Sequence, residues 1–178
     1  PTVERGAIRH GLSFVKGLGE AQADVIVQTR GNKPFTSLAN FIERAKPERR
    51  PAEWLILAGA FEAFGERRQL LWDLAEAFDI ARRPAGLPLE IPDERASMRA
   101  MPLEQQLLST FAATGVTGGM SLVELRRDAF TQAGCLPLYK LRKLRVGAKV
   151  KVGGLIADGV RRPPTAKGTA FIRLEEPE

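Results

Sequence analysis

Two glycines that flank a single apolar residue, Gly17-Leu18-Gly19, are the feature of this sequence best suited to hold a charged ligand. Glycine has no Cβ, so the backbone can turn tightly there and approach a ligand closely. Apolar residues recur at helical spacing after the turn, at Ala23 and Ile26. The first N–H groups of such a helix lack intrahelical partners and favour an anion.

This pattern predicts a helix-hairpin-helix, a motif that grips the phosphate backbone of nucleic acids without reading bases. A Gly-x-Gly sequence alone is also found where an ordinary helix ends and another begins. Here the match extends over residues 12–30, with apolar residues before the turn and a helical stripe after it. We therefore expect phosphate contacts from the turn and from nearby basic residues: Lys16, Gly17, Leu18, Gly19, Arg30 and Lys33.

The charge of the chain is distributed unevenly. The 178 residues carry a formal net charge of +6, and residues 129–174 hold ten basic residues against one acidic residue. Such a segment favours a nucleic-acid or anionic-surface partner, although a solvated basic face is the alternative. The contacts expected in this segment are Lys149, Lys151, Arg161, Arg162 and Lys167.

Several classes of site are excluded by composition. Cys135 and His10 are each the single residue of their type, so there is no disulfide framework, cysteine zinc site or Ser-His or Cys-His catalytic pair. We expect no catalytic residue, metal or cofactor in this chain. No apolar run has membrane-spanning length and no signal-peptide pattern is present, so we expect a cytoplasmic protein without a membrane partner. A first residue other than Met leads us to expect a piece of a longer protein.

The element pattern predicts a mainly α fold with a small β portion. Residues 1–81 should form a tandem helix-hairpin-helix domain, because a second helix–turn–helix with Gly59 at its turn follows the first. That turn lacks Gly-x-Gly, so we expect it to support packing more than phosphate binding, with Arg67 and Arg68 as further candidate DNA contacts. The expected helices are residues 36–45, 52–58 and one after Gly65, and the expected core aromatics are Trp54, Phe61, Phe64 and Trp72.

The second half should contain three further parts. Residues 82–101 are rich in proline and predict an extended linker, and residues 102–145 predict a helical connector in which Ser121 caps a helix. Residues 146–178 predict two strands, at 149–156 and 169–174, separated by a basic loop. These strands are typical of the start of an oligonucleotide-binding barrel (OB-fold), which needs five strands.

These segments, in this order, resemble the C-terminal region of bacterial C-family DNA polymerases, the DNA polymerase III alpha subunit and its error-prone relatives. Two details are closer to the error-prone branch: Arg67-Arg68-Gln69 before Leu71-Trp72, and the loop Thr165-Ala166-Lys167-Gly168. The segments that carry the resemblance are Ile8 to Leu12, Val15 to Glu20, Pro34 to Leu38 with Phe41, Leu57 to Phe61, Ala112 to Gly115, and Val152 to Leu155 followed by Thr165 to Gly168 and Phe171.

The resemblance implies a non-catalytic, sequence-independent DNA-binding region of a template-directed DNA polymerase. It implies double-stranded DNA at the helix-hairpin-helix, single-stranded DNA at the OB portion, other polymerase or accessory subunits as partners, and Mg²⁺ in the parent enzyme. The chain has no Asp-x-Asp, so the family's catalytic aspartates are not matched here. Residues 82–101 contain no match to the Gln-rich clamp-binding peptide of replicative members.

Two other functions remain open from the sequence. One is a protein-interaction module whose helices dock to polymerase accessory proteins, with the basic segment serving only solubility. The other is a hydrolase that uses Asp93, Glu94 or the Glu175-Glu176 pair, although these acids lie in a Pro-rich stretch and at the chain end, where no rigid element sets their geometry.

Overall fold

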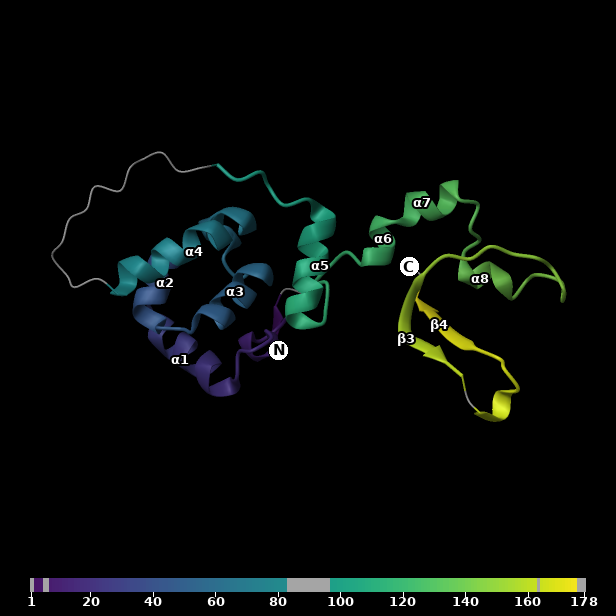
Figure 1. Cartoon of the computed structure of the whole chain (residues 1–178), viewed down its shortest axis with the longest axis horizontal. Coiled ribbons are helices and arrows are strands. Elements are labelled where there is room, and N and C mark those ends of the chain that lie inside the picture. The colour runs from purple at the N-terminus through teal and green to yellow at the C-terminus, as the bar shows by residue number, and fades with distance from the viewer. Residues whose placement is uncertain (1, 5–6, 83–96, 163, 176–178) are drawn as a thin grey trace. The chain divides into compact units, whose positions relative to one another are not determined.

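The computed structural model describes residues 2–4, 7–82, 97–162 and 164–175. The chain divides into two compact units, Pro1–Val116 and Thr117–Glu178, and each is considered by itself (Figure 1). The fold is mainly helical with small antiparallel strand pairs, as the sequence predicts.

Unit 1 begins with a short antiparallel strand pair that the sequence analysis did not predict. Its strands are β1 (Thr2–Glu4) and β2 (Ala7–Arg9), with Val3 opposite Ile8. The helical elements that follow are η1 (Leu12–Phe14), α1 (Glu20–Arg30), α2 (Leu38–Ala45), α3 (Arg49–Leu57), η2 (Glu62–Phe64), α4 (Arg67–Arg82) and α5 (Leu103–Thr114).

Local sequence explains where α2 begins and ends. The Ser37 side chain accepts a hydrogen bond from the Asn40 N–H at 3.1 Å, and the Thr36 N–H donates to the Asn40 side-chain oxygen at 3.4 Å. These bonds satisfy N–H groups that have no partner within the helix. The helix ends at Lys46, which has a left-handed φ of 46°. The cap predicted at Thr36 or Ser37 is thus confirmed for Ser37.

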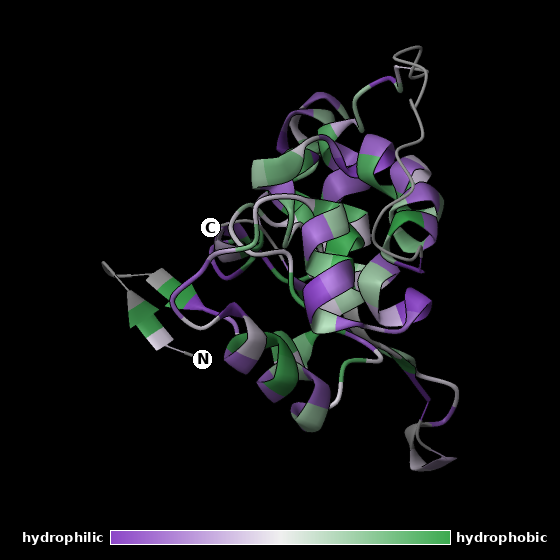
Figure 2. Cartoon of the chain, turned by 90° about the vertical axis from the view of Figure 1, so that its left-hand side faces the viewer, coloured by the Kyte–Doolittle hydropathy of each residue, from purple (hydrophilic) through white to green (hydrophobic). Residues whose placement is uncertain are grey.

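The core of unit 1 is drawn from all of the helices α1 to α4. Phe41, Leu55, Ile56 and Leu74 are each less than 2% exposed. The rings of Phe41 and Phe61 lie 4.8 Å apart. Hydrophobic and hydrophilic stretches alternate along these helices (Figure 2). The two helix pairs pack together because neither pair can bury its apolar face alone.

Several boundaries differ from the prediction. The short apolar segment before the first hairpin forms a single 3-10 turn, η1. The third helix starts at Arg49 rather than at residue 52, because proline is tolerated in a first helical turn and Pro51 lies there. The prediction that Trp72 lies in the core is wrong, since this side chain is 61% exposed on α4. Phe61 is buried as expected, and Trp54 and Phe64 are partly buried against the core.

The helix α5 was expected in a separate connector, but it belongs to the same compact unit as the hairpins. Its Leu107 and Ala113 are buried, and its backbone and hydroxyl groups bond to residues of the hairpins. Of the expected linker, residues 83–96 lie outside the described residues. Just before α5, the Met98 N–H donates to the Gln69 side chain at 3.0 Å, and Met101 is buried.

Unit 2 contains α6 (Leu122–Leu125), α7 (Arg127–Gln132), α8 (Leu138–Leu141), η3 (Pro164–Ala166) and an antiparallel pair, β3 (Leu155–Arg161) and β4 (Phe171–Glu175). Ser121 caps α6 as predicted, accepting from the Glu124 N–H at 3.0 Å. The described residues of this unit form a two-stranded sheet, so the OB-fold stays a prediction.

The first strand of unit 2 begins at Leu155 and not at the predicted residue 149. Two glycines pack closely just before this strand. A Cβ at Gly153 would lie 2.5 Å from the Phe130 ring, and one at Gly154 would lie 2.7 Å from the Glu175 carbonyl oxygen. The preceding backbone is instead held by the Lys151 carbonyl, which accepts from the Leu136 N–H at 2.7 Å.

Candidate nucleic-acid interface

The first hairpin has the geometry that the Gly-x-Gly pattern predicts. The Val15 N–H donates to the Leu12 carbonyl at 2.9 Å, and the Leu18 N–H donates to the Val15 carbonyl at 3.0 Å. Gly17 has a left-handed φ of +75°, a conformation that glycine adopts at little cost. Leu18 was expected among the phosphate contacts, but it is only 3% exposed and its side chain anchors the turn in the core. Gly17 and Gly19 on either side of it face solvent.

Unpaired backbone amides open α1 directly after this turn. The first amide bonded back to the turn is that of Ala23, which donates to the Gly19 carbonyl at 3.0 Å. The N–H groups of Gly19, Glu20 and Ala21 have no hydrogen-bond partner among the described residues. A Cβ added at Gly19 would meet no atom within 4 Å. The first turn of this eleven-residue helix therefore exposes these N–H groups to open space. Such an arrangement binds a phosphate.

Two cationic side chains contact the ring of Trp54, a residue of α3 that lies beside the turn. The Lys16 ammonium lies 5.0 Å from the centre of the Trp54 ring, and the Arg50 guanidinium lies 5.8 Å from it. A Cβ at Gly17 would be 3.7 Å from the same ring. Cation–π attraction holds both cations near the exposed glycines. Trp54 is thus a half-buried support for the hairpin.

Two basic residues at this site were missed by the sequence analysis. Arg50 shares the Trp54 ring with Lys16, and Lys46 lines a hollow together with Leu18 and Gln22 at the start of α1. Lys46 follows α2 directly, and Arg49 and Arg50 open α3, so this run of basic residues was the available signal. Only the packing of α3 against the hairpin brings the run to the site.

Arg30 and Lys33 lie away from the turn. Both are exposed, and the Lys33 N–H donates to the Arg30 carbonyl at 2.9 Å just past the end of α1. At a rise of about 1.5 Å per residue, the length of α1 separates them from Gly19 by roughly 16 Å. They are exposed basic residues, but the structure does not bring them together with Lys16.

Arg67 is not a surface contact, in contrast to the expectation from the sequence. It is 8% exposed, and its guanidinium donates to the carbonyls of Leu57 at 2.8 Å and Gln106 at 3.1 Å. It also forms an ion pair with Glu62 at 2.5 Å. Its remaining partners are the hydroxyls of Ser109 and Thr110. Arg67 joins α3, η2 and α5, and its burial removes it from the candidate DNA contacts.

Arg68 is half-buried and is also used within the chain. Its guanidinium donates to the Arg99 carbonyl at 3.3 Å and to the Gln105 side chain. The second turn itself is closed, because a Cβ at Gly59 would lie 2.5 Å from the Arg67 guanidinium. The tight packing at this turn agrees with the expectation of a supporting role.

The basic candidates of unit 2 are exposed. Arg161 lies opposite Phe171 in the strand pair, and the two line a hollow with Ile172 and Arg173. Phe171 is 57% exposed, so its ring is accessible between two guanidinium-bearing residues. The other exposed candidates are Lys149, Lys151, Arg162 and Lys167.

The described residues contain no group of three or more His, Cys, Asp or Glu side chains that could hold a metal ion. Of the acids considered for hydrolysis, Glu175 is exposed at the end of β4. Asp93, Glu94 and Glu176 lie outside the described residues. No helix in the described part of the chain is both long and apolar enough to cross a membrane.

Comparison with known proteins supports this assignment of the hairpin. A family model described as a helix-hairpin-helix motif matches residues 1–71. The error-prone DNA polymerase of Corynebacterium glutamicum is 31% identical over 172 residues, that of Azoarcus sp. is 33% identical over 180 residues, and that of Burkholderia mallei is 36% identical over 180 residues. These alignments cover 96%, 97% and 99% of this chain, and the chain spans 16% of the length of each relative.

The similarity therefore extends over nearly the whole chain and includes both units. It confirms the resemblance found in the sequence and favours the error-prone branch, since these three relatives are named as error-prone enzymes. The chain is thus similar, over nearly its whole length, to part of bacterial error-prone DNA polymerases, and its residues 1–71 match a helix-hairpin-helix motif.

Proposed function

We propose that unit 1 binds double-stranded DNA through the phosphate backbone at the first hairpin. The observation that carries this proposal is the open start of α1, where the amides of Gly19, Glu20 and Ala21 have no partner among the described residues and nothing covers Gly19. Lys16 and Arg50 add two positive charges beside these amides. Amide and cation contacts of this kind position a duplex without reading its sequence.

The parent protein, on this proposal, is a template-directed and error-prone DNA polymerase. The names of the relatives support this, and the carboxylates that hold its Mg²⁺ ions would lie in the part of the enzyme outside this chain. The present region would contribute DNA affinity rather than chemistry. Its unit 2 would contact single-stranded DNA, because the exposed Phe171 ring can stack on a base while Arg161 and Arg173 meet phosphates.

A second candidate function is docking to a protein partner such as a polymerase accessory subunit. One observation favours it. A groove between α2 and α4 is lined by two carboxylates, Asp73 and Glu76, in a chain whose net charge is positive. Two carboxylates in such a groove would repel phosphate, so the groove suits a protein partner better than DNA.

The DNA proposal is tested by measuring the affinity of the chain for a fluorescein-labelled duplex by anisotropy at several salt concentrations. We expect the affinity to fall linearly with salt on logarithmic axes, and Lys16→Glu to weaken binding at least tenfold at low salt. Lys33→Glu makes the same charge change just past the far end of α1, which lies roughly 16 Å from Gly19, so it should weaken binding much less. Equal losses in both variants would show that the hairpin is not the binding site.

A further inference from the structure

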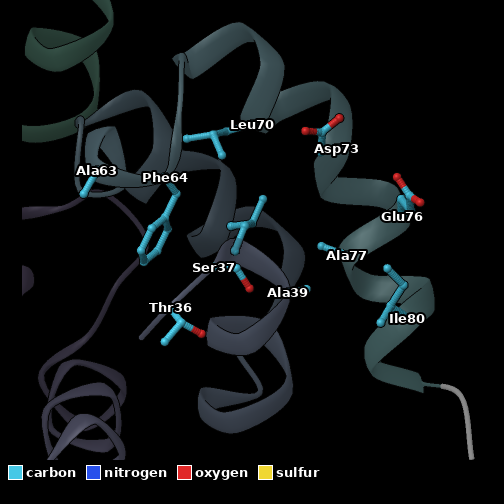
Figure 3. A pocket seen from close by; sticks show the side chains of 11 residues that line it. Thr36, Ser37, Ala39, Ala63, Phe64, Leu70, Asp73, Glu76, Ala77 and Ile80 are labelled. Carbon is cyan, nitrogen blue, oxygen red and sulfur yellow. The ribbon is translucent and has the colours of Figure 1, made fainter. Parts of the chain in front are cut away.

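A groove on the α4 side of unit 1 has a different character from the hairpin. It encloses about 400 Å³ and lies between the start of α2 and one face of α4 (Figure 3). Its apolar lining consists of four larger residues, Leu38, Phe64, Leu70 and Ile80, and three alanines, Ala39, Ala63 and Ala77. The groove shares no lining residue with the hairpin, and it is therefore a separate surface.

The polar part of the lining is acidic along α4. Asp73 and Glu76 are three residues apart on this helix and so lie on the same face. Neither has a cationic partner among the described residues, and Asp73 accepts a hydrogen bond from the Gln69 side-chain amide at 2.9 Å. Figure 3 shows both carboxylate groups on the α4 side of the groove. Within the described part of the chain, no ion pair compensates these two negative charges beside the apolar floor.

Hydroxyl groups line the opposite side. Thr36 and Ser37 precede α2, and their side chains lie across the groove from α4 (Figure 3). Ser37 uses its oxygen as an acceptor for the Asn40 N–H, so its O–H remains available as a donor. Such donors suit the backbone carbonyl groups of an extended peptide.

The length of the groove also fits a peptide. Its lining on α4 runs from Leu70 to Ile80, which is about 15 Å at 1.5 Å per residue. An extended chain covers that distance with four or five residues at about 3.3 Å each. The segment can place an apolar side chain on the floor and a basic side chain at Asp73 and Glu76, whereas a phosphate backbone would be repelled by the same carboxylates.

We propose that this groove receives a short extended segment of a partner protein that carries Lys or Arg next to an apolar side chain. The proposal specifies the site and partner chemistry of the second candidate function above, and it does not depend on DNA binding. The two carboxylates select for a basic side chain, and the apolar floor selects for an apolar one. A segment that carries both therefore binds more specifically than a segment that carries either alone.

The test uses the full chain labelled with ¹⁵N and a synthetic peptide of alternating Leu and Lys residues, added up to millimolar concentration. We expect amide shifts concentrated in residues 36–39, 63–64 and 70–80. The double variant Asp73→Asn with Glu76→Gln keeps the side-chain shapes and should weaken peptide binding at least fivefold. Asp79→Asn is the matched control, because Asp79 is an exposed acid of the same helix outside the groove lining.

Each alternative outcome overturns the proposal. Absence of shifts, or shifts elsewhere, would show that the groove does not accept such a segment. An equal loss with Asp79→Asn, or equal binding of a Leu and Glu peptide, would indicate unspecific attraction. Shifts of the groove residues on addition of a DNA duplex would make it a nucleic-acid surface. The double variant should keep its duplex affinity, so failure of this proposal is distinguishable from failure of the DNA proposal.

Discussion

The backbone N–H of Lys16 donates a hydrogen bond of 2.8 Å to the carbonyl of Ala113, which joins the first hairpin to the last turn of α5. Nearly a hundred residues separate the two in sequence. The bond uses a carbonyl that the end of a helix leaves without an intrahelical partner. It fixes the backbone that carries the Lys16 ammonium, so α5 packs with the candidate DNA-binding hairpin and is not a separate connector.

Loss of packing under α5 should therefore affect both stability and DNA binding. Leu107 is 8% exposed, and Leu107→Ala is expected to lower the free energy of unfolding by about 2–3 kcal/mol. Duplex affinity should fall a few-fold, because the support of the hairpin is loosened. Urea unfolding and anisotropy measure the two effects. Leu108→Ala on the same helix, at a side chain 47% exposed, should change neither.

The two glycines of the turn should respond differently to valine. Gly19 has a φ of −70° and open space above it, so Gly19→Val is expected to cost less than about 1 kcal/mol of stability while weakening duplex binding at least tenfold. The added side chain would occupy the place of the phosphate. Gly17→Val forces a left-handed φ of +75° on a branched residue and should cost at least about 1–2 kcal/mol. Duplex affinity unchanged in folded Gly19→Val would contradict the phosphate site.

Trp54 should matter for DNA binding through the cations that it holds. Trp54→Leu removes two cation–π contacts, each worth about 0.5–1 kcal/mol at exposed sites, so duplex affinity should fall by up to about five- to thirtyfold. Trp54→Phe should restore part of it. Trp72→Leu serves as the control, because Trp72 is exposed on α4 and contacts neither cation. A similar loss in both variants would argue against this role of Trp54.

Arg67 should prove to be a stability residue. Arg67→Met leaves the carbonyls of Leu57 and Gln106 without this donor and is expected to lower the free energy of unfolding by at least about 2 kcal/mol. Arg68→Met should cost under about 1 kcal/mol, since its contacts are exposed. Chemical denaturation distinguishes the two. Equal, small effects would show that Arg67 does not hold α3 and α5 together.

Local features of the fold could be predicted from the sequence because they depend on near neighbours. The Ser37 cap and the positive φ of Gly17 follow from the chemistry of a few adjacent residues. The helix that begins after Gly19 follows from the periodic apolar pattern, whereas the burial of Leu18 contradicts its expected role as a phosphate contact. The candidate phosphate site was visible for the same reason, because its amides belong to one continuous segment.

The surroundings of that site could not be read from the sequence, because they depend on contacts between distant segments. Arg67 and Arg68 look alike in sequence, yet only packing against α5 decides that Arg67 is buried. In the same way, Arg50 reaches the hairpin only through Trp54. The sequence by itself determined the turn, its charge and its family. Tertiary structure decided which cations lie beside the turn and which are buried and bonded within the chain, because burial and distance are set only when the helices pack.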